Sequence, residues 1–261
     1  MVVLAAGCGR FGFGDGVADA RSDGQADGPG DGQGGDSGDS GGGGSLCAQS
    51  GAMICDGFEQ LMFDPRWTLN LTAGSAVLDS TRAFRGSASV HFHTNAVNAG
   101  TSPGALLRTN QGLAGAITGY VHLRAWVYFA SPYPAGVYDQ VLNVVNASTT
   151  GVSIGSRDGF MRSNDYHFLR SAISMTVGFP LDRWACLQLQ VPSNVEMPTR
   201  VFVDGVEVVD IRLMPPSGFI QPAADHIYVG MDWVTTAVAL PATDAWFDEL
   251  IVDDQPTTCA Q

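Results

Sequence analysis

The stretch Val121-His122-Leu123-Arg124-Ala125-Trp126-Val127-Tyr128-Phe129 decides the fold class of this chain. Successive side chains of a β-strand point to opposite faces, so residues two apart share a face. The stretch therefore predicts a strand with two different faces. The core face is formed by Val121, Leu123, Ala125, Val127 and Phe129, and the outer face by His122, Arg124, Trp126 and Tyr128.

The same alternation recurs along the chain. At 184–191 it places Leu187, Leu189 and Val191 inward, with Gln188 and Gln190 opposite. Asp204-Gly205 lies between β-branched runs and predicts a hairpin over 200–211. We expect further strands at 87–94, 140–146, 167–177, 226–234 and 245–254. No helical period follows Ile54, so the sequence predicts an all-β antiparallel jelly-roll sandwich.

The first part of the chain has a different composition. Residues 9–46 consist mainly of Gly, Asp and Ser and contain too few apolar side chains to form a core. We therefore expect a disordered acidic linker at 9–46 and one domain at 47–261. The chain of 261 residues has a formal charge of -13 and no basic stripe, which argues against a nucleic-acid partner.

The linker is preceded by a short apolar run that ends at Cys8. Leu4-Ala5-Ala6-Gly7-Cys8 resembles a bacterial lipobox, in which a signal peptide is cleaved before a lipidated cysteine. The run is short, has no basic residue before it, and carries Ala5 where the motif usually has Leu. We expect residues 1–8 to be a truncated signal peptide and the protein to be exported and lipid-anchored at Cys8 to the bacterial outer membrane or cell surface. The alternative is an accidental run of small residues with a free thiol.

Four further cysteines remain, an even number that suggests two disulfides in an exported protein. They are Cys47, Cys55, Cys186 and Cys259, and three pairings are open. We favour Cys47 with Cys259, which would join the two ends of the domain, and Cys55 with Cys186.

Two segments near the end of the chain resemble a known family. Val201–Val208 reads VFVDGVEV and Trp246–Asp254 reads WFDELIVDD, and both resemble the last strands of the concanavalin A-like lectin/glucanase superfamily, particularly laminin G-like domains. The sequence CDGFE at 55–59 is similar to the opening strand of such domains in bacterial surface lipoproteins. The resemblance implies a jelly roll with a concave sheet and makes calcium a candidate cofactor. It implies no particular ligand.

Hydrolase motifs are missing or incomplete. Glycosidases of this superfamily carry a Glu-x-Asp-x-Glu strand, and none of the glutamates of this chain has an aspartate two positions later. Ser153 lies in a Gly-x-Ser-x-Gly sequence, but the residues after it are poor helix formers, and a nucleophile elbow needs a helix there. We expect this match to be a coincidence.

Two histidine-containing patterns are also incomplete. His91 and His93 share one side of a strand, but no third metal ligand is identifiable, so we expect ordinary strand positions and no metal site. Tyr138, Gln140, His122 and Arg124 would fit the roles of the Tyr, Gln, His and Arg of alginate-lyase jelly rolls. The Arg-rich strand and the Gln-x-His pair of those lyases are absent.

The outer face of the predicted strand 121–129 is the clearest candidate binding surface. Aromatic rings and planar polar groups are the side chains that hold sugars. The expected platform consists of Arg124, Trp126, Tyr128, Gln188 and Gln190. In the alternative interpretation a loop covers this face and Trp126 is simply packed. The sequence therefore predicts a surface-anchored binding module for a glycan or a surface protein, without catalysis. The alternatives are a polysaccharide lyase and a structural envelope protein.

Overall fold

The computed structural model describes residues 45–110, 112–113, 117–134, 137–148, 150–234 and 238–259. Cys8, the expected lipobox and residues 9–44 of the expected linker lie outside the described residues. None of the described helices is long and apolar enough to cross a membrane.

The described chain is built almost entirely of strands. A short 3-10 helix, η1 (Leu46–Gln49), precedes them, and a second one, η2 (Val209–Ile211), follows β13. The strands are β1 (Ile54–Asp56), β2 (Trp67–Thr72), β3 (Gly74–Asp79), β4 (Ser89–Thr94), β5 (Gly104–Thr109), β6 (Gly119–Phe129), β7 (Asp139–Asn146), β8 (Gly151–Arg157), β9 (Phe160–Asp165), β10 (Arg170–Gly178), β11 (Trp184–Ser193), β12 (Arg200–Val203), β13 (Val206–Glu207), β14 (Ala224–Trp233) and β15 (Thr243–Asp253).

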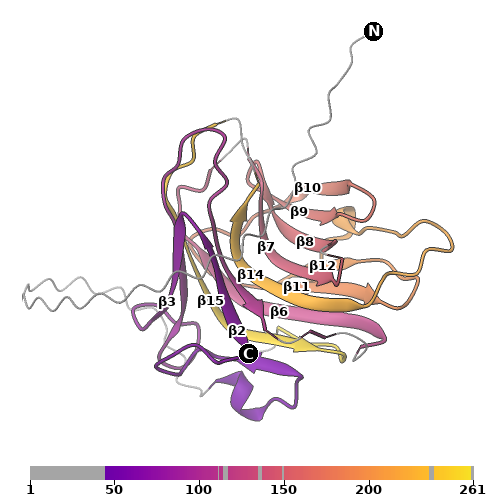
Figure 1. The fold of residues 1–261 in the computed structure, drawn as a ribbon, viewed down its shortest axis with the longest axis horizontal. Coiled ribbons are helices and arrows are strands. Elements are labelled where there is room, and N and C mark those ends of the chain that lie inside the picture. The colour runs from indigo at the N-terminus through magenta and orange to yellow at the C-terminus, as the bar shows by residue number, and fades with distance from the viewer. Residues whose placement is uncertain are drawn as a thin grey trace, which may run out of the picture. The chain divides into compact units, whose positions relative to one another are not determined.

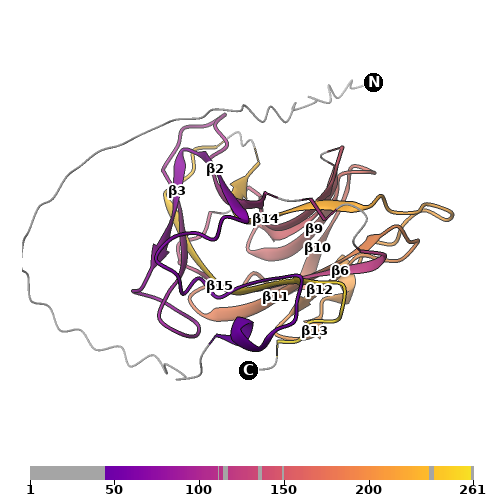
Figure 2. The same cartoon turned by 60° about the horizontal axis from the view of Figure 1, so that its bottom comes forward.

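The strands form two antiparallel sheets, as the sequence predicts. Sheet A has the order β13-β12-β11-β6-β15-β4-β3, with β1 paired to β15. Sheet B has the order β10-β9-β8-β7-β14-β5-β2. Figure 1 shows the fold, and Figure 2 places β6, β11, β12 and β15 in one layer and β9, β10 and β14 in the other. The arrangement is a jelly-roll β-sandwich.

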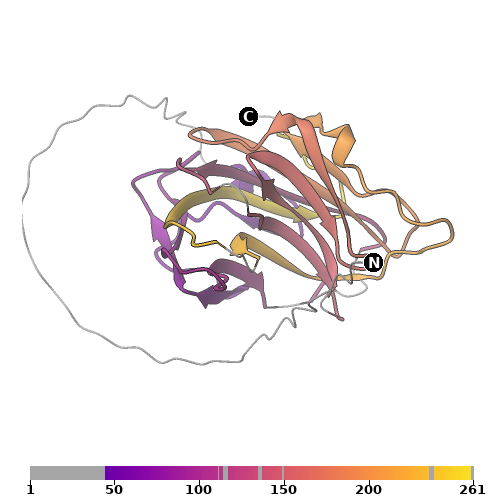
Figure 3. The same ribbon diagram turned by 90° about the horizontal axis from the view of Figure 1, so that it is seen from above.

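The core lies between the sheets and follows the alternation of the sequence. Leu123 of β6 and Leu187 of β11 point inward from sheet A, and Leu107 of β5 and Leu142 of β7 are equally buried in sheet B. Figure 3 shows the same layers from above. Burial of a large aliphatic side chain stabilises the fold by about 1.5 to 3 kcal/mol, so this alternation holds the two sheets together.

The predicted hairpin at 200–211 is confirmed, but its second strand is short. Asp204 and Gly205 both have positive φ, 52° and 81°, as the tight turn between β12 and β13 requires. After Glu207 the chain leaves the sheet and forms η2, and Ile211 enters the core from there.

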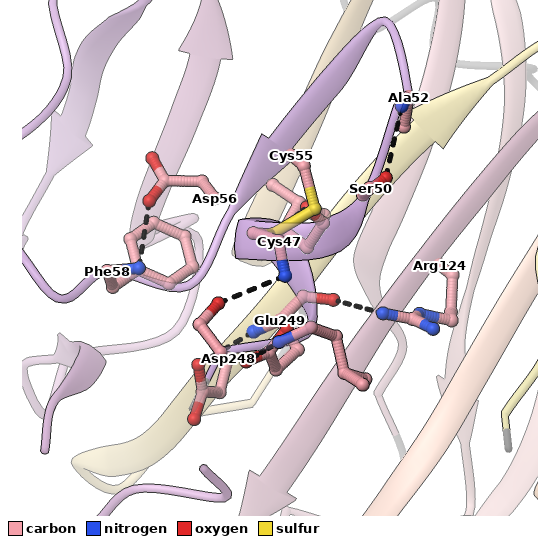
Figure 4. The surroundings of a disulfide bond; sticks show 12 residues. Cys47, Ser50, Ala52, Cys55, Asp56, Phe58, Arg124, Asp248 and Glu249 are labelled. Carbon is pink, nitrogen blue, oxygen red and sulfur yellow. Dashed lines mark hydrogen bonds between the residues drawn. A yellow bond between two sulfur atoms is a disulfide. The ribbon is translucent and has the colours of Figure 1, made fainter. Parts of the chain in front are cut away.

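The predicted disulfide pairing is wrong. The structure joins Cys47 to Cys55, with Cα atoms 5.2 Å apart, and Cys186 to Cys259, with Cα atoms 5.8 Å apart. Figure 4 shows the first bond. Because β1 pairs with β15, and the backbone N–H of Leu46 donates to Glu249 Oε1 of the same strand, Cys47 and Cys55 meet there.

The second disulfide fastens the C-terminal segment, residues 254–259, to sheet A. Gln188 of β11 donates a hydrogen bond to the carbonyl oxygen of Thr257, so the chain passes over β11 and brings Cys259 to Cys186. Each end of the domain is thus tied to a strand beside it, and the two ends are not tied to each other. Two disulfides are typical of exported proteins in an oxidising compartment.

Candidate functional site

The five expected platform residues lie together on the outer face of sheet A. In the register of β6 and β11, Gln188 pairs with Arg124, and Gln190 pairs with His122. The platform is therefore continuous along two neighbouring strands.

This face is covered, as in the alternative interpretation in which a loop packs over Trp126. The exposed fraction is 4% for Arg124, 5% for Trp126, 5% for Gln188 and 9% for Gln190. Tyr128 is partly exposed. Phe84 stacks on Trp126 with ring centroids 3.7 Å apart. Arg124 Nη1 donates to the carbonyl oxygen of Thr258 at 2.7 Å. Ligand binding by these residues stays a prediction that requires the covering segments to move.

Two other motifs of the sequence have definite places. Ser153 lies in the middle of β8, paired on both sides, so its surroundings are not those of a nucleophile elbow. His91 Nε2 and His93 Nδ1 both lie 2.8 Å from Asp244 Oδ1. The described residues contain no group of three or more His, Cys, Asp or Glu that could hold a metal ion.

The lyase-like set proposed from the sequence is divided between the two sheets. Tyr138 and Gln140 lie at the start of β7 in sheet B, whereas His122 and Arg124 lie on β6 in sheet A. Because the core separates the sheets, these four side chains do not form one site.

The structure brings a different set of polar residues together on the outer face of sheet B. One row of paired positions crosses the sheet from β5 to β9 and contains Arg108, Tyr228, Asn143, Ser153 and Asn164. Gln140 and Asp232 form a second pair between β7 and β14, and Arg162 lies two positions before Asn164 on β9. We call these eight residues the sheet B polar face.

Several N–H groups of the sheet B polar face are buried without a hydrogen-bond acceptor in the described structure. They are Nε of Arg108, Nε2 of Gln140, and Nε and Nη1 of Arg162. Buried donors are nearly always paired in folded proteins, and an unpaired one is costly. Three side chains on this face can therefore donate to acceptor atoms of a ligand. Arg124 Nε and Trp126 Nε1 are likewise unpaired on sheet A, where Phe84 and the C-terminal segment lie against them.

Neighbouring groups hold both arginines in place. The Arg162 guanidinium carbon lies 3.8 Å from the ring centroid of Tyr138. Arg108 Nη2 lies 3.1 Å from His226 Nε2, and His226 Nδ1 faces the carboxylate of Asp225. Because Nε2 must accept from the guanidinium, the proton lies on Nδ1 and is donated to Asp225. Arg108 is thus oriented by a relay from the same strand as Tyr228.

The titratable groups around this face have shifted pKa values. Burial raises the pKa of Asp232 to about 7, with the nearby charge of Asp139 as the second cause. No hydrogen-bond partner of the Asp232 carboxyl occurs among the described residues. Burial also raises the pKa of Tyr166 to about 12 and raises that of Tyr228, so both phenols keep their protons at neutral pH.

Sequence reasoning missed the sheet B polar face. Its signal was present in the segment 226–234, where Tyr228 lies between the inward residues Ile227 and Val229, as Trp126 does on β6. The sequence analysis does not predict β5, β8 and β9, because Gly104, Gly151 and Gly155 weaken the patterns of β5 and β8 and residues 162–165 make β9 mainly polar. Without these three strands, the sequence does not show that Arg108, Tyr228, Asn143, Ser153 and Asn164 lie side by side.

Comparisons with known proteins identify the fold. No family model matches the chain, and no curated protein matches it. The solved structure of Cellulose induced protein, Cip1, is similar with a TM-score of 0.63 and 15% identity, covering 79% of this chain and all of that one. An endo-β-1,4-glucuronan lyase from the fungus Trichoderma reesei has a TM-score of 0.48 and 11% identity, covering 80% of this chain and 92% of that one. The binding domain of botulinum neurotoxin DC in complex with SialylT has a TM-score of 0.46 and 9% identity, covering 73% of this chain and 44% of that one. The chain has the jelly-roll β-sandwich fold, consistent with the resemblance to the concanavalin A-like superfamily.

Proposed function

We propose that the sheet B polar face binds a glycan chain. The observation that carries this proposal is the group of buried, unpaired N–H donors on Arg108, Gln140 and Arg162. Sugars present many hydroxyl and ring oxygens, which accept hydrogen bonds from such groups. Binding would therefore satisfy donors that the folded chain leaves unsatisfied.

The neighbouring side chains suit the same ligand. Tyr228 presents an aromatic ring, and Asn143 and Asn164 present amides that both donate and accept. Rings combined with planar polar groups match the alternating apolar and hydroxyl-bearing faces of a sugar. Sheet A offers a similar composition and its side chains are buried to a similar degree, but there the C-terminal segment and Phe84 lie against them.

A second candidate function is a polysaccharide lyase, and Asp232 is the observation that favours it. Its carboxyl group, with the pKa raised to about 7, can accept a proton at neutral pH. Tyr228 and Tyr166 remain protonated and can donate one. A β-elimination needs both a base and an acid, and these groups share one region of the molecule.

A glycan array followed by calorimetric titration of the best ligand tests the binding proposal. Asn143→Ala on sheet B should lower affinity roughly tenfold, the effect of losing a hydrogen bond of about 1.4 kcal/mol. Gln190→Ala, which removes a similarly buried amide from sheet A, is the matched control and should bind as the wild type does. The reverse result would assign the ligand to sheet A and overturn the proposal.

The lyase candidate is tested on the same ligand by following the ultraviolet absorbance of an unsaturated product. A lyase should form that product, and Asp232→Asn should abolish its formation while affinity stays near that of the wild type. If the polymer binds and no product forms, the protein is a binding module and the lyase candidate is wrong.

A further inference from the structure

The arginines of the sheet B polar face differ from most others in their charge partners. Six arginines of the described chain form an ion pair with a carboxylate, as Arg157 does with Asp158 and Arg170 with Asp165. Among the described residues, Arg108 and Arg162 form none, and neither do Arg82, Arg85 and Arg124, of which Arg124 donates to the carbonyl oxygens of Thr258 and Glu249. Neither guanidinium group of this face is therefore paired with a carboxylate of the described chain.

Burial makes the lack of an anion significant. Arg162 is only 7% exposed, and its Nε and Nη1 groups have no acceptor in the described structure. A buried charge is normally paired, because water no longer compensates it. Burial lowers the pKa of Arg162, but a guanidinium keeps its proton at any physiological pH. The site therefore holds a permanent positive charge that calls for an external anion.

The spacing of the two arginines indicates how long that ligand is. Arg108 lies on β5 and Arg162 on β9, with β14, β7 and β8 between them. Neighbouring strands lie about 4.8 Å apart, so the four steps span about 19 Å. The intervening residues Tyr228, Asn143 and Ser153 carry no charge. A single sugar cannot reach both arginines, whereas a polymer that crosses the strands can.

We infer that the sheet B polar face takes a carboxylated polysaccharide, a polyuronate, whose separate carboxylates pair with Arg108 and Arg162. This inference rests on the proposed glycan-binding function. Guanidinium groups match the planar geometry of carboxylates and bind them in charge-assisted hydrogen bonds. A densely sulfated polymer is a poorer fit, because the face offers two isolated cations and the chain has a net charge of -13.

The test titrates the full-length protein with three polymers: polygalacturonate, the same polymer after its carboxyl groups are reduced to alcohols, and a sulfated galactan. We expect polygalacturonate to bind at least tenfold more tightly than the other two, and its affinity to fall with added salt. Equal affinity for the reduced polymer would overturn the inference while leaving glycan binding in place. Tightest binding of the sulfated polymer would also overturn it. If no polyuronate binds, either in this titration or on the glycan array, the inference fails, whereas the glycan-binding proposal fails only if no glycan on the array binds.

Arginine variants test which side chains bind the carboxylates of the polymer. Arg162→Gln and Arg108→Gln should each weaken polygalacturonate binding roughly tenfold and leave the affinity for the reduced polymer unchanged. Arg157→Gln is the control, because Arg157 lies at the end of the neighbouring strand, is largely exposed and pairs with Asp158. Arg108 is partly exposed, so its variant should fold even if Arg162→Gln does not. Unchanged polyuronate affinity in the folded Arg108 variant would contradict the inference.

Discussion

Arg124 Nη1 donates a hydrogen bond of 2.7 Å to the carbonyl oxygen of Thr258, which lies next to the cysteine that anchors the C-terminal segment to β11. A strand residue that the sequence assigns to a binding surface is thus used to hold the end of the chain. Together with the stacking of Phe84 on Trp126, this contact closes the outer face of sheet A.

Trp126→Ala should therefore reduce stability rather than ligand affinity. Truncating a buried Trp costs about 3 to 5 kcal/mol through lost burial and the cavity that remains. Denaturant unfolding of the variant measures the free energy of unfolding, and a glycan titration of the folded fraction measures affinity. A loss of affinity of 1 to 3 kcal/mol, the approximate scale of a stacked aromatic anchor, with nearly unchanged stability would show that the platform on sheet A is open after all.

The two disulfides should stabilise the domain unequally. The chain-entropy model relates the effect to the length of the loop closed, and the sequence separations are 73 for Cys186–Cys259 and 8 for Cys47–Cys55. The model gives about 4.4 and about 2.5 kcal/mol, respectively. Replacing each pair by serines and comparing the free energies of unfolding tests this order. Non-reducing peptide mapping of the wild type should show these two pairs, and a Cys47–Cys259 peptide would contradict the structure.

Stability should fall as pH rises through the titration of Asp232. Its pKa is about 7 in the folded protein against an ordinary value of 3.8, so the folded state binds the proton more tightly than the unfolded state does. Between about pH 4 and pH 7 this group therefore lowers the free energy of unfolding, by roughly 4 kcal/mol at most.

Asp232→Asn removes that contribution, because the amide imitates the protonated carboxyl group. The variant should be more stable than the wild type at about pH 8, and the difference should vanish near pH 4. Carboxylates with lowered pKa values, such as Asp165 and Glu207, act in the opposite direction in both proteins and cancel in the comparison. A difference that does not vary with pH would contradict the assigned shift.

We further propose that Cys8 carries lipid when the full-length precursor is expressed. The proposal rests on the small residues before Cys8 and lies outside the described residues. Mass spectrometry of the mature N-terminus should find a lipidated cysteine there. An unmodified Cys8 thiol, or cleavage at another residue, would sink the proposal.

The local sequence is enough to determine which segments become strands and which of their faces turn inward. In 121–129 the apolar residues alternate strictly, and a strand exposes alternate residues to opposite sides, so the inward positions of Leu123 and Leu187 follow from the pattern alone. The turn at Asp204-Gly205 is equally local, because it depends on positive φ at these two positions.

Only the tertiary structure decides what covers each outer face and which distant residues meet there. Trp126 and Tyr228 occupy equivalent patterns in their strands, yet Trp126 lies under Phe84, whereas Tyr228 lies in a row with Arg108 and Asn143. That difference depends on strand order and on the path of residues 254–259, since pairing between strands far apart in sequence leaves no local signal. The disulfides follow the same rule: an even number of cysteines predicts two bonds, but Cys259 reaches Cys186 only because the chain end crosses β11.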